Sequence, residues 1–152
     1  MTKKEKIEIF IDGGARGNPG PAALGVVIKN QKGNAIKKYS QFLGTETNNI
    51  AEYSALVFAL KKIKLIFGKA KIKELEIEVF SDSQLLVEQL NGRYKILDPE
   101  IQRLFLEAWN LKVELPVFKI KHISREENKE ADYLVNQELD SQQKNKFTLP
   151  SF

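Results

Sequence analysis

The sequence predicts an α/β fold: a five-stranded mixed sheet, three antiparallel strands plus two parallel ones, flanked by helices on both faces. Two observations support this class. Three apolar segments near the N-terminus are joined by short turns, which indicates an antiparallel meander. The later apolar segments alternate with helical patterns, and such crossovers favour parallel pairing. We expect a single domain over residues 1–152, with a core at about 6–140 and a C-terminal tail at 141–152.

The N-terminal segments have the two-residue period of strands. Ile7, Ile9 and Ile11 occupy alternate positions, so they share one face. Glycine, asparagine and proline then mark turns. Strands are predicted over residues 6–12, 22–29 and 35–42, with a turn-rich loop at 12–20 and a hairpin turn at 31–34.

The rest of the chain alternates helices with strands. A wide apolar helical face predicts a long helix that begins at Thr47–Asn49 and stops at Gly68. Pro99 and a capping-box pattern at 124–127 predict two further helix starts. The remaining elements are expected as strands at 75–79 and 115–121, a short helix capped at 81–83 that ends near Leu90, a helix opening at Asp98, and a final helix that includes Leu139.

Composition excludes several classes of protein. The chain has no cysteine, which rules out disulfides, thiolate metal sites and cysteine nucleophiles. Its longest apolar run, residues 55–60, is far shorter than the ~18 residues that a membrane helix needs. Glu8 interrupts the N-terminal apolar segment, so we expect no secretory signal. We therefore expect a monomer in the cytoplasm, with no membrane partner.

The charges are unevenly distributed. The net charge of +4 is a weak indication of a polyanionic partner. Six lysines between Lys61 and Lys73 have no acidic residue among them, whereas acids outnumber bases from Ser124 to Asp140. The lysine run has two interpretations: a nucleic-acid-binding surface, or a solvated helix face.

Four carboxylates lie at the ends of predicted elements. Asp12 and Asp82 end strands that the crossover rule makes parallel neighbours, and ligands of open α/β sheets gather at such ends. Glu52 and Asp132 lie near the starts of flanking helices, so they can project into the same space. Each acid also has an ordinary structural explanation as a turn residue, helix cap, dipole partner or exposed side chain.

The neighbouring residues favour the functional interpretation. Four blocks surround the acids: DGGARGNPG at 12–20, TNNIAE at 47–52, SDSQ at 81–84 and HISREENKEAD at 122–132. Together they resemble ribonuclease HI, the type 1 ribonuclease H family, from about Ile7 to Leu139. The resemblance implies the ribonuclease H-like fold. It also implies hydrolysis of the RNA strand of RNA–DNA hybrids, with 5′-phosphate and 3′-hydroxyl ends.

The resemblance also implies the cofactor. In the family the four acids hold two Mg²⁺ ions, and Mn²⁺ can substitute. By this likeness Asp12 contacts both ions, Glu52 and Asp82 complete one site, and Asp132 completes the other. The chemistry agrees, since clustered carboxylates repel one another without cations and hard oxygen ligands suit these metals.

Substrate contacts are implied by the same blocks. Amide groups can donate and accept, so they can recognise the 2′-hydroxyl that separates RNA from DNA. Helix capping and turn formation are the alternative roles for several of these side chains. The residues at family contact positions are Asn18, Thr47, Asn48, Asn49 and Gln84.

His122 and the helix connections depart from the best-known branch of the family. His122 lies ten residues before Asp132, as an accessory histidine does in that branch, but the glycine-rich loop is missing. A proton-transfer or product-release role and a silent one therefore both stay open. Residues 91–98 replace the basic substrate handle, and we expect no N-terminal hybrid-binding module. The lysine run, or Arg93 and Lys95, is the expected substitute.

Three functions remain to be compared. The first is the catalytic hybrid nuclease. The second is a nucleic-acid-binding module of the same fold that has lost catalysis, although all four acids are present here. The third is a nuclease that also cleaves double-stranded RNA, because a site without a handle has few contacts with which to select the strands.

Overall fold

The computed structural model describes residues 4–147. Three strands come first, and helices then alternate with two further strands. The elements are β1 (Glu5–Ala15), β2 (Gly20–Asn30), β3 (Ala35–Glu46), α1 (Asn48–Ile72), β4 (Leu75–Ser81), α2 (Gln84–Leu90), α3 (Pro99–Val113), β5 (Val117–His122), the short 3₁₀ helix η1 (Arg125–Asn128) and α4 (Lys129–Phe147).

The strands form one mixed sheet in the order β3-β2-β1-β4-β5. β1 pairs antiparallel with β2, and β2 pairs antiparallel with β3. β1 and β5 each pair parallel with β4. The predicted fold class is therefore confirmed, and the ends of β1 and β4 lie side by side, since Ile11 is in register with Ser81.

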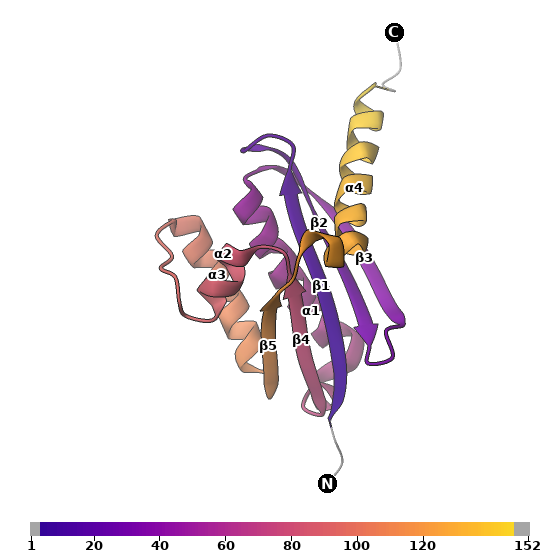
Figure 1. Cartoon of the computed structure of the whole chain (residues 1–152), viewed down its shortest axis with the longest axis vertical. Helices are drawn as coiled ribbons and strands as arrows, with labels where there is room; N and C mark the ends of the chain where they lie inside the picture. The colour runs from indigo at the N-terminus through magenta and orange to yellow at the C-terminus, as the bar shows by residue number, and fades with distance from the viewer. Residues whose placement is uncertain (1–3, 148–152) are drawn as a thin grey trace.

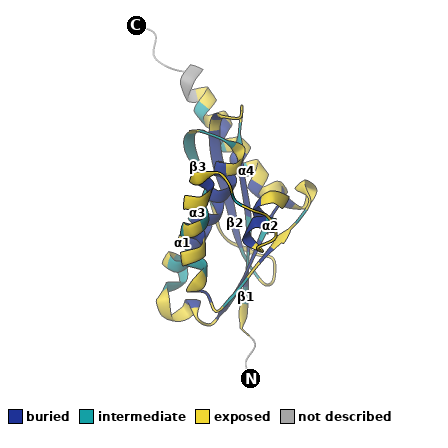
Figure 2. Ribbon diagram, turned by 90° about the vertical axis from the view of Figure 1, so that its left-hand side faces the viewer, coloured by how far each residue is buried: buried dark blue, intermediate teal, exposed yellow. Residues whose placement is uncertain are grey.

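Helices cover both faces of this sheet. In Figure 1, α4 lies in front of the strands and α1 lies behind them. Alternation along β2 divides the core accordingly: Leu24, Val26 and Ile28 pack with α1, whereas Ala23 packs under α4 with Val135 and Leu139. Figure 2 shows the buried residues concentrated on the strands and on the helix surfaces that face them. The cluster under α4 is much the smaller of the two.

Most helix ends follow the capping patterns of the sequence. The hydroxyl of Thr47 accepts the Ile50 N–H at 3.2 Å, and the Asp98 carboxylate accepts the Glu100 N–H at 2.8 Å. Several boundaries differ from the prediction. β1 continues to Ala15 into the predicted loop, β3 continues to Glu46, and the capping box at 124–127 opens η1, after which α4 begins at Lys129. Two differences concern helix ends. Gly68 kinks α1 with a φ of 80°, but the helix resumes and ends at Ile72. α4 extends to Phe147, so residues 141–147 of the predicted tail are helical, and 148–152 lie outside the described residues.

Candidate active site

Gly13 brings α1 against the end of β1. A side-chain carbon at this position would lie 2.2 Å from the carbonyl carbon of Ala51 and 2.4 Å from the Glu52 nitrogen, so only glycine permits the contact. Asp12 precedes Gly13, and its side chain is on the opposite face of β1. The close approach therefore places Glu52 beside Asp12, in the C-terminal part of β1.

Gly25 allows a similar close approach of α4 to β2, on the opposite face of the sheet from α1. It pairs with Asp12 in the β1–β2 register, and a side-chain carbon here would lie 2.4 Å from the carbonyl oxygen of Ala131. The next residue of α4 is Asp132. Two glycines on neighbouring strands thus let helices from opposite faces deliver one acid each to Asp12.

Three of the four predicted acids form a tight cluster. Asp12, Glu52 and Asp82 each present a carboxylate oxygen, and these three oxygens lie within 4.8 Å of one another. Asp12 is 7% exposed and Glu52 is 9% exposed, while Asp82 is half-buried at the end of β4. The predicted convergence is present, because Asp12 and Asp82 each follow the last parallel pair of β1 and β4, Ile11 and Ser81. β1 itself does not end at Asp12 as predicted, since it continues to Ala15 beside β2.

The environment opposes ionisation of the two buried acids. Burial, followed by the charges of Asp82 and Asp132, raises the pKa of Asp12 to about 8. Burial, followed by the charges of Asp12 and Asp82, raises the pKa of Glu52 well above its usual range. Arg125 acts in the opposite direction on Glu52, but more weakly. Without a compensating cation, the cluster is under electrostatic strain.

The cluster fits a hard divalent cation. Oε2 of Glu52 is buried and has no hydrogen-bond partner among the described residues, which is a costly state for a polar atom. Asp12 accepts the Gly13 N–H at 3.0 Å through Oδ1, so its other oxygen can face the cluster. An all-oxygen donor set is what Mg²⁺ and Mn²⁺ prefer. A cation here would neutralise the repulsion and satisfy the Glu52 oxygen.

Asp132 lies outside the tight cluster, but it interacts with one member of the cluster, Asp12. The Asp132 side chain is exposed, yet its charge contributes to the raised pKa of Asp12. All four acids line one pocket. Its lining residues are Asp12, Gly13, Gly14, Ala15, Arg16, Asn48, Glu52, Asp82, Arg125, Asp132, Val135, Asn136 and Leu139.

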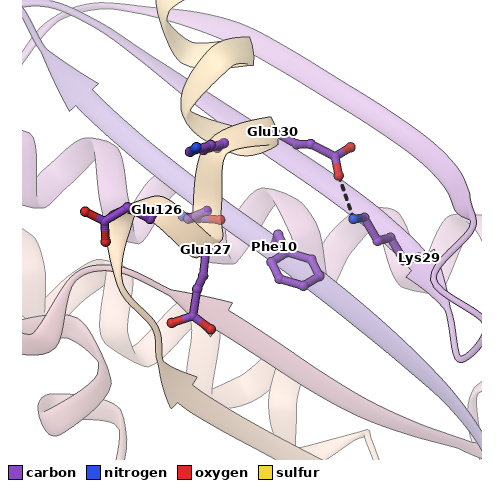
Figure 3. A pocket seen from close by; sticks show the side chains of 7 residues that line it. Phe10, Lys29, Glu126, Glu127 and Glu130 are labelled. Atoms are coloured by element: carbon purple, nitrogen blue, oxygen red, sulfur yellow. Dashed lines mark hydrogen bonds and ion pairs between the residues drawn. The ribbon is translucent and has the colours of Figure 1, made fainter.

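The other acids of the segment 124–140 have separate contacts. Glu127 accepts the Ser124 N–H at 3.2 Å in the predicted capping box, and Glu130 binds Lys29 at 2.6 Å. Figure 3 shows Glu130 reaching toward Lys29 beside Phe10, while Glu126 and Glu127 point away from it. The excess of negative charge in this segment therefore does not enlarge the cluster, and Asp132 is the one acid of the segment that lines the same pocket among the described residues.

The predicted substrate contacts partly serve the local structure. The side-chain oxygen of Asn18 accepts the Asn48 N–H at 3.0 Å, and that of Asn48 accepts the Ala15 N–H at 2.9 Å. With the Thr47 cap, these bonds join the loop after β1 to the start of α1. Asn48 also lines the acid pocket. Asn49 and Gln84 are exposed near the first turns of α1 and α2.

His122 is not brought to the acids. It ends β5, is exposed, and is in register with Ser81 rather than Asp82. Within the described part of the chain it does not line the acid pocket. Its accessory role stays a prediction.

The lysine run is mostly engaged elsewhere. Lys61 pairs with Glu107 at 2.7 Å, Lys64 pairs with Glu114, and Lys71 pairs with Glu5 at 3.2 Å. Lys71 also lies roughly 28 Å from Glu52 along α1, given a rise of about 1.5 Å per residue. These contacts favour the solvated helix face over the nucleic-acid surface. Arg93, the other proposed substitute, pairs with Glu88 at 3.1 Å.

Sequence reasoning missed three polar residues of the pocket: Arg16, Arg125 and Asn136. Arg16 and Arg125 lie inside the quoted blocks, but nothing in those blocks separates them from their neighbours. Asn136 follows Asp132 by four residues, and that helical spacing was the available signal.

The chain is similar to ribonucleases H in sequence and in structure. The family model described as "Reverse transcriptase-like" matches residues 10–138. Ribonuclease HI of Halobacterium salinarum is 36% identical over 135 residues, which cover 89% of this chain and 65% of the relative. The chain thus spans just under two thirds of that relative's length.

Solved structures match over nearly their whole length. LC11-RNase H1, isolated from compost by a metagenomic approach, is 44% identical with a TM-score of 0.85, covering 90% of this chain and 96% of that chain. LC11-RNase H1 in complex with an RNA/DNA hybrid is 44% identical with a TM-score of 0.82, covering 86% of this chain and 94% of that chain. RNase H1 from the halophilic archaeon Halobacterium salinarum NRC-1 is 37% identical with a TM-score of 0.81, covering 90% and 98%.

Proposed function

Because the chain belongs to the type 1 ribonuclease H family, we propose that it is an endonuclease that hydrolyses the RNA strand of RNA–DNA hybrids and leaves 5′-phosphate and 3′-hydroxyl ends. One observation carries the proposal: the oxygens of Asp12, Glu52 and Asp82 converge within 4.8 Å. A buried cluster of like charges destabilises a fold unless cations occupy it. A non-catalytic binding module has no use for such a cluster.

The four acids are the proposed ligands of two Mg²⁺ ions, for which Mn²⁺ can substitute. Asp12 belongs to the tight cluster and also interacts with Asp132, and these two relations support a bridging role for it. When bound, the two ions would supply charge stabilisation for the attacking and leaving oxygens of an in-line phosphoryl displacement. The chain's own task is to hold carboxylate oxygens in place. Burial fixes Asp12 and Glu52, and the end of β4 fixes Asp82.

An RNA–DNA hybrid is the proposed substrate, and the hybrid complex of LC11-RNase H1 supports this choice. Arg125 contributes a cation to the pocket lining, where it attracts backbone phosphates. The side-chain oxygens of Asn18 and Asn48 accept backbone N–H groups, so their NH₂ groups remain as donors for a sugar or phosphate. The proposed contacts are Asn18, Thr47, Asn48, Asn49 and Gln84.

The test is cleavage of an RNA–DNA hybrid labelled on either strand, with Mg²⁺, Mn²⁺ or EDTA. We expect metal-dependent cutting of the RNA strand alone, with 3′-hydroxyl and 5′-phosphate product ends. Glu52→Gln should abolish cutting. Glu74→Gln is the matched control, because Glu74 is 71% exposed and contacts only Lys71, at 3.8 Å, among the described residues.

Three outcomes would count against the proposal or change it. Equal cutting by Glu52→Gln would contradict the assigned site. Tight hybrid binding by folded wild-type protein without cutting in either metal would support the binding-module function instead. Equal cutting of a matched RNA duplex would extend the substrate class to double-stranded RNA.

A further inference from the structure

We propose that Arg16 and Asn136 act as a positioning relay that holds the Asp132 carboxylate toward Asp12. The inference rests on the proposed function, since it assigns a role to residues around that same site. Neither side chain is a proposed metal ligand. Their effect is on Asp132, which is the one acid of the four whose side chain is exposed.

Asn136 contacts Asp132 directly. Its side-chain nitrogen donates to the Asp132 backbone oxygen at 3.0 Å and to the carboxylate Oδ1 at 3.3 Å. The two residues are four positions apart, so they lie on the same side of α4. The Asn136 amide therefore contacts the Asp132 carboxylate from the next turn of the same helix, α4.

Arg16 determines which way the Asn136 amide points. Its Nη2 donates to the Asn136 side-chain oxygen at 3.3 Å. Because a guanidinium has donors only, it selects the orientation in which the amide oxygen faces Arg16 and the NH₂ group faces Asp132. The reverse orientation would place the amide oxygen against a carboxylate.

Arg16 is itself held by α4. Nη2 pairs with the Asp140 carboxylate at 2.7 Å, and Nη1 donates to the Gln143 side-chain oxygen at 3.3 Å. Arg16 also extends the end of β1, where its backbone N–H donates to the Pro21 oxygen at 2.8 Å. The relay thus connects the strand that carries Asp12 to the helix that carries Asp132.

The relay answers a physical problem at this site. Asp132 faces another carboxylate at Asp12, so repulsion favours turning its exposed side chain out to solvent. A donor aimed at the carboxylate favours the inward orientation. Hydrogen bonds behind metal-binding carboxylates commonly change metal affinity or activity by about 10–100-fold.

The test compares Asn136→Ala with Gln137→Ala. Gln137 is the next residue of α4, but it lines a different pocket with Tyr133 and Leu134. We expect Asn136→Ala to raise the half-saturating Mn²⁺ concentration about tenfold, measured by titration calorimetry and by the Mn²⁺-induced rise in Tm. Gln137→Ala should stay within about twofold of wild type. Circular dichroism in EDTA checks that both variants remain folded.

A double-variant cycle tests whether Arg16 acts through Asn136. Arg16→Lys keeps the positive charge but loses the planar fork, so we expect an intermediate loss of Mn²⁺ affinity. Combined with Asn136→Ala, it should add no further loss, because the second contact is already gone. Fully additive losses would mean that Arg16 acts separately, and would overturn the relay.

Metal binding and cleavage separate this inference from the proposed function. If wild-type protein cleaves the hybrid but Asn136→Ala binds Mn²⁺ as Gln137→Ala does, the relay fails and the function stands. If wild-type protein binds Mn²⁺ without cleaving and only Asn136→Ala weakens binding, the function fails and the relay stands. If Mn²⁺ does not bind wild-type protein, both are overturned.

Discussion

The two sides of the acid pocket are held by different forces. On one side Asp12 and Glu52 are buried, and the backbones of β1 and α1 touch at Gly13. On the other side Asp132 is exposed on α4, whose apolar cluster contains only Ala23, Val135 and Leu139 with Phe42 among the described residues. The buried side is therefore fixed when the chain folds, whereas the exposed side depends on polar contacts that can change without unfolding.

This difference separates stability from function. Ionised carboxylates in a buried cluster oppose folding, so removing one should stabilise the metal-free protein. An exposed carboxylate costs the fold little. The same chemical substitution on the two sides should thus have similar consequences for catalysis and different ones for stability.

The largest effect is expected for the acids themselves. Glu52→Gln and Asp132→Asn should each lower hybrid cleavage by at least about a hundredfold, because each removes a proposed metal ligand. In EDTA, Glu52→Gln should raise the free energy of unfolding by about 1 kcal/mol or more, while Asp132→Asn should leave it within about 0.5 kcal/mol. Urea unfolding in EDTA measures both. If Asp132→Asn raised the free energy of unfolding as Glu52→Gln does, the proposed difference between the buried and the exposed side of the pocket would be contradicted.

The two glycines provide the next comparison. Gly13→Ala should lower the free energy of unfolding by about 3 kcal/mol, because the new carbon meets the Ala51 backbone inside the main core. Gly25→Ala should cost about 1 kcal/mol, since α4 can shift outward on its small cluster. Both variants should lose cleavage. Equal stability losses would show that α4 is as rigidly packed as α1.

The pH dependence of stability should follow the buried side. The pKa of Asp12 is about 8 in the folded, metal-free protein and ordinary when unfolded, so the folded state binds the extra proton. The contribution of Asp12 to stability is therefore greatest at low pH and decreases as pH rises from about 4 to about 8, by up to about 1.4 kcal/mol per pH unit.

Metal should reverse this trend, because cation binding needs the ionised carboxylates. The Mn²⁺-induced rise in Tm should grow between pH 5 and pH 8. Thermal unfolding with EDTA or Mn²⁺ at several pH values measures both slopes. Asp12→Asn is the control, which should flatten the EDTA curve, and an unchanged slope in that variant would assign the effect to other groups.

The buried side was also the side that the sequence predicted better. Alternating Ile7, Ile9 and Ile11 and the crossover pattern were sufficient to place Asp12 beside Asp82, where the parallel pairing of their strands ends, although not to show that β1 continues to Ala15. Apolar periodicity also gave α1, although not its continuation past Gly68. Local patterns predict these features because strand period, helix period and caps are properties of neighbouring residues.

Features made by distant residues were not predictable in the same way. The close packing at Gly13 depends on the backbone of Ala51, which belongs to α1. The Arg16–Asn136 contact joins side chains that are 120 positions apart in the chain. The lysine run kept two interpretations in the sequence because its partners, Glu107 and Glu114, lie on α3 and at its C-terminal end, far along the chain. His122 has the family spacing to Asp132, yet β5 ends with it outside the pocket.

The smallest effect concerns the cations that attract the substrate. Arg125 lines the acid pocket, whereas Lys71 pairs with Glu5 far along α1. Arg125→Gln should raise KM for the hybrid about threefold to tenfold with a smaller change in kcat, and should reduce the salt dependence of binding. Lys71→Gln, which removes the same charge, should stay within about twofold. Steady-state cleavage at several salt concentrations measures both variants. A larger effect of Lys71→Gln would show that the lysine run contacts the substrate, and that the bound hybrid extends beyond the pocket.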